Sequence, residues 1–352
     1  MQLRGILFFQ ALLFFLCGFC YGRDAAISSG FKNELSQALT FGSRTVLSAL
    51  WSPEELSGNS EEKRVTGQTA ALSRNPSRPA VPKSHHPTLG PELQDSIRRV
   101  NPIGSKKIIA LTFDLCESAN EKSGYDADIV KYLRENNIKA TFFAGGKWML
   151  SHSEKTLQLM ADPLFEVGNH SWSHANFRMI DFDQMEAQIL WVQAQYEFLW
   201  KRLRERAVAK QIDPFEMNKI PRTPLLFRFP YGACNSQALD LLRRYGLPAI
   251  QWDVVTGDPS PDQSPQAIAR VILQRSRPGS IIICHANGRG YGTAASLPLF
   301  VPKLHALGYD FLTVSELLTH GPVVSHKECY ELTPGDNLRY DRAKQVKQGD
   351  NH

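Results

Sequence analysis

Short apolar runs that favour β-strands alternate with stretches of helical periodicity from about residue 101 to residue 320. The apolar runs are KKIIALTFD, KATFFAGG, FEVGNHS, LLFRFPYG, PAIQWDVVTGD, SIIICHA and YDFLTVSELL. The helix-like stretches between them cover residues 127–136, 153–161, 183–207, 236–245 and 264–275. This alternation predicts an α/β fold, a parallel sheet or (β/α) barrel with its functional loops at the C-terminal ends of the strands. The polar residues at those ends are therefore the candidates for chemistry.

The chain on either side of this region has other patterns. Residues 29–51 predict one or two amphipathic helices, because apolar side chains recur there at roughly helical spacing: Phe31, Leu35, Leu39, Val46 and Leu50. Residues 52–91 are rich in Ser, Pro, Asn, Arg and Glu, which favours an extended linker. We therefore predict an N-terminal helix and linker at 23–100, the α/β domain at 101–320, and a polar C-terminal tail at 321–352.

The first 22 residues have the features of an export signal. Arg4 precedes an apolar run at residues 6–19, and the small Gly22 stands just before the charged Arg23. The run is too short for a comfortable membrane span but suits a secretory segment, so we predict cleavage near Gly22. The predicted location is periplasmic or secreted. If the segment stayed uncleaved, it would tether the protein to the membrane.

Composition and charge narrow the class of protein. The chain has 352 residues, of which 42% are hydrophobic and 21% charged, as in an ordinary globular protein. The net charge is only +5, and the 40 basic residues are dispersed along the chain. Nucleic-acid binding would need a concentrated basic stripe, so we predict none.

Four cysteines follow the export signal: Cys116, Cys234, Cys284 and Cys329. In an exported protein, four cysteines permit two disulfides in three possible pairings. None of them forms a CxxC pair, which argues against a structural zinc ribbon. Cys329 could attach the C-terminal tail to the domain.

The stretch GNHSWSH places His170 and His174 four residues apart. A helix beginning near Asn169 would put both imidazoles on one face, where they could bind one divalent metal. The alternative is a surface or structural pair. The Gly-Asn turn directly after an apolar strand favours the metal site.

Other strand ends carry further candidates. Asp114 ends LTFD, and Arg228 in RFPYG could hold a catalytic carboxylate ionised through a bidentate pair. His285 ends the run SIIICH, where it could protonate a leaving amine. Asp253 and Asp258 in WDVVTGDP are the carboxylates that could fix the tautomer of His285.

In their order along the chain (Asp114, the HxxxH pair, RFPYG, the late aspartate and His285), the five motifs resemble the polysaccharide deacetylase family, the nodulation-type deacetylases of carbohydrate esterase family four. The resemblance covers roughly residues 105–318 and includes KATFFAGGKW. It implies a distorted (β/α) barrel that removes N-acetyl or O-acetyl groups from polysaccharides with a metal-activated water. The absence of a Gly-x-Ser-x-Gly motif agrees with this, since no covalent acyl-enzyme is then expected.

The resemblance also implies roles for individual residues. His170 and His174 would be ligands of a divalent metal, with zinc expected. Asp114 would be the general base, and Arg228 would tether it. At the other side of the site, the backbone N–H of Tyr231 would stabilise the oxyanion. His285 would be the general acid, and Asp258 would be the partner of that acid.

Three positions depart from the family pattern. The family's third metal ligand, an aspartate directly after the base, is Leu115 here. A frequent tryptophan after the late aspartate is Pro259, and a frequent acidic residue after the last histidine is Ala286. Leucine cannot bind a metal, so another side chain must take its place. The candidates are Asp114 itself, Cys116, Glu117 and Asp126; Cys116 could equally form a disulfide, and Glu117 could be a solvated loop residue.

Three functional interpretations remain. The first is a deacetylase acting on peptidoglycan or a related N-acetylated polymer. The second is a carbohydrate-binding pseudoenzyme that lost its metal through Leu115. The third is an amidohydrolase of small molecules on the same barrel, such as a deformylase, which would need a closed pocket in place of an open groove. Retention of Asp114, Arg228 and His285 favours an enzyme, because binding alone requires no acid–base pair.

Overall fold

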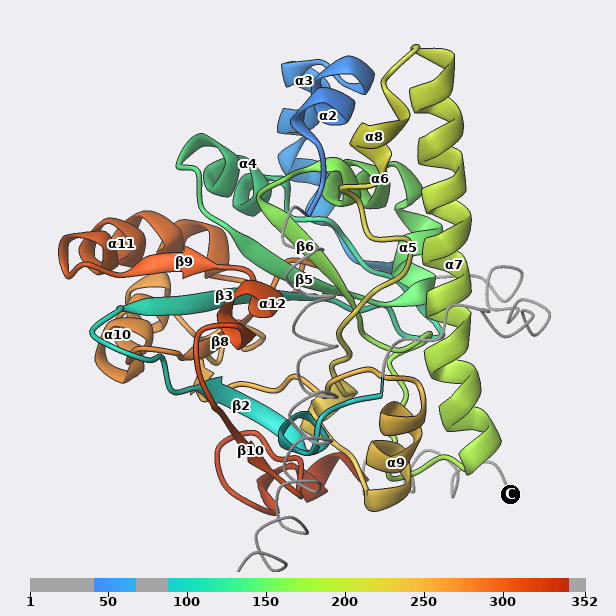
Figure 1. Ribbon diagram of the computed structural model, residues 1–352. Coiled ribbons are helices and arrows are strands. Elements are labelled where there is room, and N and C mark those ends of the chain that lie inside the picture. The colour runs from blue at the N-terminus through green and yellow to red at the C-terminus, as the bar shows by residue number, and fades with distance from the viewer. Residues whose placement is uncertain (1–40, 68–87, 342–352) are drawn as a thin grey trace, which may run out of the picture.

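The computed structural model describes residues 41–67 and 88–341. The predicted export signal, residues 29–40 of the predicted N-terminal helices, and the middle of the predicted linker lie outside the described residues. The α/β architecture expected for the central region is present (Figure 1). No helix within the described ranges is long and apolar enough to cross a membrane.

A six-stranded parallel sheet occupies the centre of the molecule. Its strands follow the order β6-β5-β3-β8-β7, and β9 pairs with the beginning of β3. The bounds are β3 Ile108–Leu115, β5 Ala140–Ala144, β6 Phe165–Asn169, β7 Val254–Val255, β8 Ile281–His285 and β9 Asp310–Leu312. Isolated parallel bridges continue the sheet from Asn169 to Phe227 and on to Ala249, and Ile250 pairs with Ile97. The predicted distorted (β/α) barrel is therefore confirmed.

The side chains of strand β3 pack in two different hydrophobic clusters, because successive side chains of a strand point to opposite faces. One set of its side chains packs in the large hydrophobic cluster under the helices: Ile109, Leu111, Phe113 and Leu115. Ile108 and Ala110 belong instead to the cluster inside the barrel. Asp114 continues this inner set, so the chain carries its carboxylate to the C-terminal mouth of the barrel while Leu115 stays in the core.

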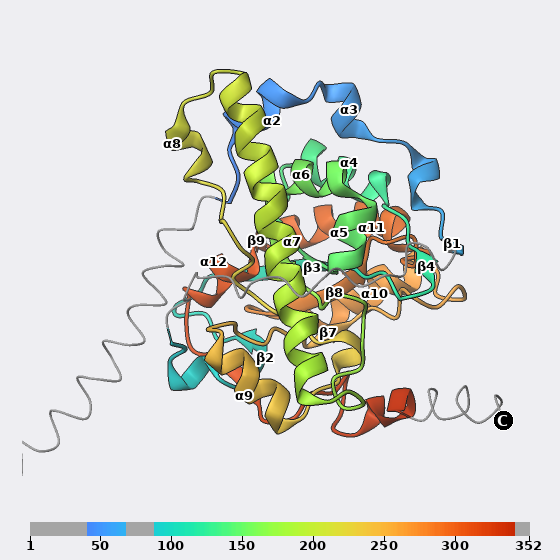
Figure 2. The same cartoon turned by 90° about the vertical axis from the view of Figure 1, so that its right-hand side faces the viewer.

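Helices surround the sheet. Their bounds are α4 Ala127–Glu135, α5 Gly146–Ser151, α6 Ser153–Ala161, α7 Phe182–Ala209, α8 Pro214–Met217, α9 Ser236–Arg244, α10 Pro265–Arg275, α11 Thr293–Ala306 and α12 Val314–Leu318. Figure 2 shows the long α7 lying across one side of the molecule, where it contacts α5, α6, α8 and α9. It begins at a capping box of Asp181 and Gln184. The pattern did not predict α11, which contains Pro298 and Pro302.

The described part of the N-terminal region packs on the domain. Helix α2 spans Arg44–Leu50 and contacts α6, α7 and α8. Residues 52–67, expected to be extended linker, include α3 Pro53–Ser57, the 3-10 helix η1 Ser60–Lys63 and strand β1 Thr66–Gly67, which pairs with β4 Glu121–Lys122. The difference arises because Ser52 and Asn59 each begin a short helix with a capping box.

The chain after α12 also packs on the domain. Strand β10 Val323–His326 pairs antiparallel with β2 Ser96–Val100, which follows the 3-10 helix η3 Pro91–Leu93. A disulfide joins Cys234 to Cys329, whereas Cys116 and Cys284 are free and buried. The short helix η5 Asp336–Leu338 lies near the end of the described residues.

Candidate active site

Asp114 forms a buried ion pair with Arg228 at the mouth of the barrel. Arg228 Nη1 donates to Asp114 Oδ1 at 2.8 Å and to Thr112 Oγ1 at 2.9 Å. Its other nitrogens donate to the carbonyl oxygens of Ile250 and Gln251, both at 3.3 Å. The contact thus uses one guanidinium nitrogen, and the bidentate geometry expected from the sequence is not formed. Burial alone would raise the pKa of Asp114, but neighbouring positive charges outweigh it and lower that pKa.

His170 lies beside this ion pair and is itself buried. Its Nδ1 is 2.9 Å from the Arg228 carbonyl oxygen, so Nδ1 carries the hydrogen and Nε2 keeps its lone pair. Nε2 is 3.4 Å from Asp114 Oδ2 and has no hydrogen-bond partner among the described residues. Burial lowers the pKa of His170 despite the nearby Asp114 charge, which keeps the imidazole neutral. A neutral imidazole with an unpartnered Nε2 is suited to binding a cation.

His174 lies beside His170 but in a loop. The prediction of a helix from the HxxxH spacing is therefore wrong. Strand β6 ends at Asn169, whose Oδ1 accepts a hydrogen bond from the Ser171 N–H at 3.0 Å. Ser171 and His174 then adopt φ values of 65° and 56°, in the left-handed region. The two imidazole centroids are nevertheless 5.1 Å apart. The loop therefore brings together the pair that a helix was expected to align.

Cys116, two residues beyond Asp114, completes a group of three donors. One donor atom each of Cys116, His170 and His174 lies within 4.8 Å of the others. The side-chain amide of Asn287 donates to the carbonyl oxygen of Cys116 at 2.8 Å and to its Sγ at 3.0 Å. Burial, together with the charge of Asp114, raises the pKa of the Cys116 thiol, so the thiol is protonated in the metal-free protein and would have to lose this proton on binding a cation.

The other candidates for a third ligand have different surroundings. Leu115 is fully buried in the core on the helix side of β3. The Glu117 carboxylate accepts hydrogen bonds from the Ser123 N–H at 3.1 Å and from Ser151 Oγ at 2.7 Å. Asp126 precedes α4 and is not a member of the three-donor group. The geometry thus brings Cys116, and neither Glu117 nor Asp126, to the two histidines.

This donor set fits a divalent metal. Zinc binds sulfur and imidazole nitrogen readily, and catalytic zinc sites use three protein ligands with a fourth position left open. The tautomer of His170 is fixed by a backbone carbonyl, as is usual for a ligand histidine. Its unpartnered Nε2 is the buried polar atom that a metal would satisfy.

Opposite the three donors, His285 is held by Asp258. Its Nδ1 donates to Asp258 Oδ1 at 3.0 Å, and its backbone N–H donates to Oδ2 at 2.6 Å. The hydroxyls of Thr256 and Thr293 also donate to this carboxylate, at 3.0 and 2.6 Å. Burial alone would lower the pKa of His285, but the charge and hydrogen bond of Asp258 raise it above its ordinary value. The imidazole is therefore poised to carry a proton.

Two further sequence candidates are Asp253 and Tyr231. Asp253 accepts hydrogen bonds from the Ile281 N–H at 3.0 Å and from Ser280 Oγ at 3.1 Å, so Asp258 is the carboxylate that pairs with the histidine. Tyr231 lies in the Pro-Tyr-Gly turn with φ 59°. Its ring centroid is 4.5 Å from that of His174.

Six of the residues described above line one cavity of about 420 Å³: Asp114, Cys116, His174, Tyr231, Asp258 and His285. Sequence reasoning missed several other lining residues: Trp252, Arg289, Glu331, Arg339 and Tyr340. Trp252 lies in an apolar run that signalled only a strand. Arg339 and Tyr340 come from the predicted polar tail, where no pattern distinguishes a pocket residue from a solvated one.

Comparison with known proteins places this geometry in context. Residues 102–250 match the model of the polysaccharide deacetylase family. A peptidoglycan-N-acetylglucosamine deacetylase of Listeria monocytogenes is 28% identical over 265 residues, which cover 75% of this chain and 48% of the relative. A protein of the same description from Bacillus cereus is 27% identical over 219 residues, covering 61% and 90%. This chain thus spans about half the length of the Listeria relatives.

The fold has a solved counterpart. The crystal structure of a peptidoglycan N-acetylglucosamine deacetylase matches with a TM-score of 0.52 at 24% identity, covering 64% of this chain and 93% of that chain. The matched residues include Asp114, His170, His174 and Arg228, which the structure brings together at the barrel mouth. Residues 102–250 of this chain are therefore similar to the polysaccharide deacetylase family.

Proposed function

We propose that this protein is a metal-dependent hydrolase that removes N-acetyl or O-acetyl groups from an envelope or extracellular polysaccharide, such as peptidoglycan or an N-acetylglucosamine polymer. One observation carries the proposal. A group of three donors that could hold a metal ion lies beside the Asp114–Arg228 pair, and His285, which is paired with Asp258, lies on the neighbouring strand in register with Asp114. The names of the relatives, which describe peptidoglycan deacetylases, support the substrate class.

In this proposal His170, His174 and Cys116 hold the metal, with Cys116 in the place of the family's aspartate. When bound, a divalent metal such as zinc polarises the acetyl carbonyl and lowers the pKa of water toward ~7. Leu115 does not prevent this, because its side chain belongs to the core and the next residue on the inner face supplies the third donor.

Asp114 acts as the general base. Arg228 keeps its carboxylate ionised, so Oδ2 can accept a proton from the attacking water. Arg228 can hold this geometry because it is fully buried and packs on the rings of Phe143 and Trp252, with its guanidinium carbon 4.0 and 5.4 Å from their centroids. The base is therefore both charged and positioned before substrate arrives.

His285 acts as the general acid. Asp258 accepts the Nδ1 hydrogen, which leaves Nε2 to deliver a proton to the leaving nitrogen or oxygen. The raised pKa of His285 favours the protonated form that this role needs. The backbone N–H of Tyr231 is the proposed donor to the developing oxyanion.

The location follows from the same proposal. A deacetylase of envelope polysaccharide acts outside the cytoplasm, which agrees with the export signal predicted at residues 1–22. We therefore propose a periplasmic or secreted protein.

Acetate release from a panel of N-acetylated and O-acetylated glycans tests the proposal. We expect zinc-loaded protein to release acetate and chelator-treated protein to release none. The double variant His170→Ala, His174→Ala should be inactive yet folded. Metal-independent glycan binding without acetate release, unchanged in this double variant, would identify a pseudoenzyme instead. Turnover of small N-acyl compounds but of no polymer would favour the small-molecule amidohydrolase.

A further inference from the structure

We infer that residues 329–341, here named the clasp, form one wall of the substrate pocket and set the affinity for a sugar chain, and that the Cys234–Cys329 disulfide holds this wall in place. The inference deepens the proposed function and rests on it for the identity of the ligand. Its structural basis does not depend on the metal, because the contacts of the clasp residues given below are made with residues other than the three donors.

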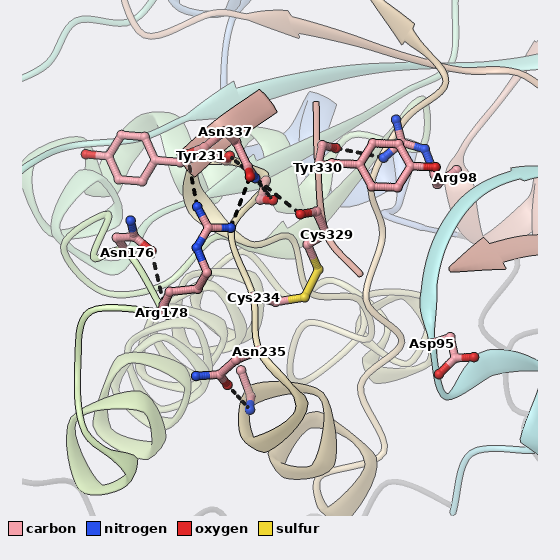
Figure 3. Close-up of a disulfide and its surroundings, with 12 residues drawn as sticks. Asp95, Arg98, Asn176, Arg178, Tyr231, Cys234, Asn235, Cys329, Tyr330 and Asn337 are labelled. Atoms are coloured by element: carbon pink, nitrogen blue, oxygen red, sulfur yellow. Dashed lines mark hydrogen bonds between the residues drawn. A yellow bond between two sulfur atoms is a disulfide. The ribbon is translucent and has the colours of Figure 1, made fainter. Parts of the chain in front are cut away.

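The first anchor joins the clasp to the Pro-Tyr-Gly turn. Cys329 is disulfide-bonded to Cys234, which follows this turn after one residue (Figure 3). The buried Asn337 side-chain amide donates to the backbone carbonyls of Tyr231, Gly232 and Cys329. The clasp is therefore tied at Cys329 and at Asn337 to the backbone that presents Tyr231 to the pocket.

The second anchor joins the clasp to the loop that carries His174. Arg178 donates to the side chain and carbonyl of Asn337, at 3.0 and 2.9 Å. The same guanidinium pairs with the Asp341 carboxylate through two nitrogens, both at 2.9 Å, and the Asn176 amide donates to that carboxylate at 2.6 Å. Such bidentate pairs fix orientation as well as distance.

The third anchor joins the first residues of the clasp to strand β2 and to Trp252. Arg98 on β2 donates to the carbonyl oxygens of Tyr330 and Glu331, at 2.7 and 2.6 Å, and its guanidinium stacks 3.9 Å from the Tyr330 ring centroid (Figure 3). The Trp252 indole N–H also donates to the Glu331 carbonyl, at 3.1 Å. Since Trp252 lines the pocket, this contact joins the clasp directly to the pocket floor.

The side chains that the clasp presents are suited to sugar rings. Glu331, Arg339 and Tyr340 all line the cavity. The Tyr340 ring packs 5.0 Å from that of Tyr231, which in turn contacts His174. Arg339 and the Tyr340 hydroxyl both bond to the Glu331 carboxylate. Aromatic faces receive the apolar faces of a sugar, and charged planar groups beside them receive its hydroxyls.

A purely structural role would leave these side chains enclosed, but the Arg339 side chain is 55% exposed and Tyr340 is half-buried. The clasp is thus fixed at its backbone and open at its side chains, as expected of a binding wall. Because the side-chain hydrogen bonds of Asp114 and His285 go to Arg228 and Asp258 and those of the pocket-facing clasp side chains go to one another, loss of the clasp should weaken binding more than it slows the chemical step.

The test compares the full-length protein with Tyr340→Ala, Tyr340→Phe and Cys329→Ser, using the N-acetylglucosamine tetramer as the probe. Phe215→Ala is the matched control, since Phe215 is an exposed aromatic residue on α8. Calorimetry gives Kd, acetate release gives kcat and KM, and cobalt(II) binding reports the metal site. Cys234→Ser and the double variant Cys234→Ser, Cys329→Ser break the same bond and should match Cys329→Ser.

We expect Tyr340→Ala and Cys329→Ser to raise Kd and KM about 5- to 10-fold, with kcat changed less than about 2-fold and cobalt binding unchanged. Phe215→Ala should stay close to wild type, whereas Tyr340→Phe, which keeps the ring but loses the hydroxyl bond to Glu331, should fall between wild type and Tyr340→Ala. If wild type bound the tetramer without releasing acetate, the proposed function would fail and the clasp would still be supported by the Kd values. No binding by wild type, or an unchanged Kd in Tyr340→Ala, would overturn the inference.

Discussion

A single side-chain amide joins Asn287 to Cys116: Nδ2 donates to the Cys116 carbonyl oxygen at 2.8 Å and to Sγ at 3.0 Å. Asn287 is fully buried in the turn after β8, so it orients the sulfur toward the two histidines and can stabilise a thiolate there. An outer partner of this kind commonly contributes about 10- to 100-fold to metal affinity.

The first prediction follows from this contact. Asn287→Leu removes the donor at similar side-chain size and should weaken zinc binding by about 10- to 100-fold. Asn287→Gln, which keeps an amide, should fall in between. Competition with a chromophoric chelator measures the affinity, and urea denaturation of the metal-free proteins controls for a general loss of stability. Equal zinc affinity in all three proteins would mean that the amide serves only the loop backbone.

The second prediction concerns the sulfur ligand. With cobalt(II) in place of zinc, wild type should show a thiolate-to-metal absorption band in the near ultraviolet. Cys116→Asp should bind cobalt without that band, and Cys116→Ala should bind on the order of 100-fold more weakly or worse, because a ligand is lost outright. Cys284→Ala is the matched control, since Cys284 is the other free and buried thiol. A band that survives in Cys116→Ala would exclude Cys116 as the ligand.

The third prediction separates the catalytic role of Asp114 from its contribution to the stability of the fold. Asp114→Asn should lower acetate release by roughly 10²- to 10⁴-fold, because an amide cannot accept the proton. It should also lower the free energy of unfolding by about 3–5 kcal/mol, since Arg228 is left buried without its anionic partner. Assays of acetate release measure the loss of activity, and urea denaturation measures the loss of stability. Asp253→Asn, which alters a carboxylate outside the pocket, should keep its activity per folded molecule.

The fourth prediction concerns pH and stability. Burial raises the pKa of Glu166 from 4.5 to about 7, although Ser315 and Thr141 donate hydrogen bonds to its carboxylate. Below pH 4.5 the folded and unfolded states are both protonated. Between 4.5 and about 7 only the unfolded state loses the proton, so the free energy of unfolding falls as pH rises. The total loss is on the order of 3 kcal/mol, and it persists at higher pH.

Glu166→Gln isolates this effect, because the glutamine cannot ionise. The difference in unfolding free energy between wild type and the variant should therefore shift across this window in favour of the variant. Urea denaturation at several pH values from about 4 to 8 measures it. A difference that does not change with pH would show that Glu166 titrates normally.

Much of the fold was predictable from the sequence, because β-prone runs and helical periodicity are local signals. Strands β3, β5, β6 and β8 and most long helices follow directly from them. Helix α11 was not predicted, because two prolines argue against a helix that packing on α10 stabilises. The capped helices in residues 52–67 were hidden by a composition typical of linkers.

The candidate site was predictable in its parts and less so in its geometry. Strand-end positions indicated Asp114, Arg228 and His285, and all three lie at one barrel mouth. The loop around His174 depends on two left-handed residues, which spacing cannot reveal. Cys116 could be chosen over Glu117 only once the histidines were placed in space. The clasp depends on contacts between residues far apart in the chain, for which the sequence carries no local signal.

The most direct test of the account is a zinc titration of metal-free protein, with acetate release from an N-acetylglucosamine oligomer measured at each step. We predict that activity rises linearly and saturates at about one equivalent of zinc in wild type, and that the double variant His170→Ala, His174→Ala stays inactive throughout. Full activity before zinc is added, or no activity at any zinc level across the glycan panel, would contradict a metal-dependent deacetylase.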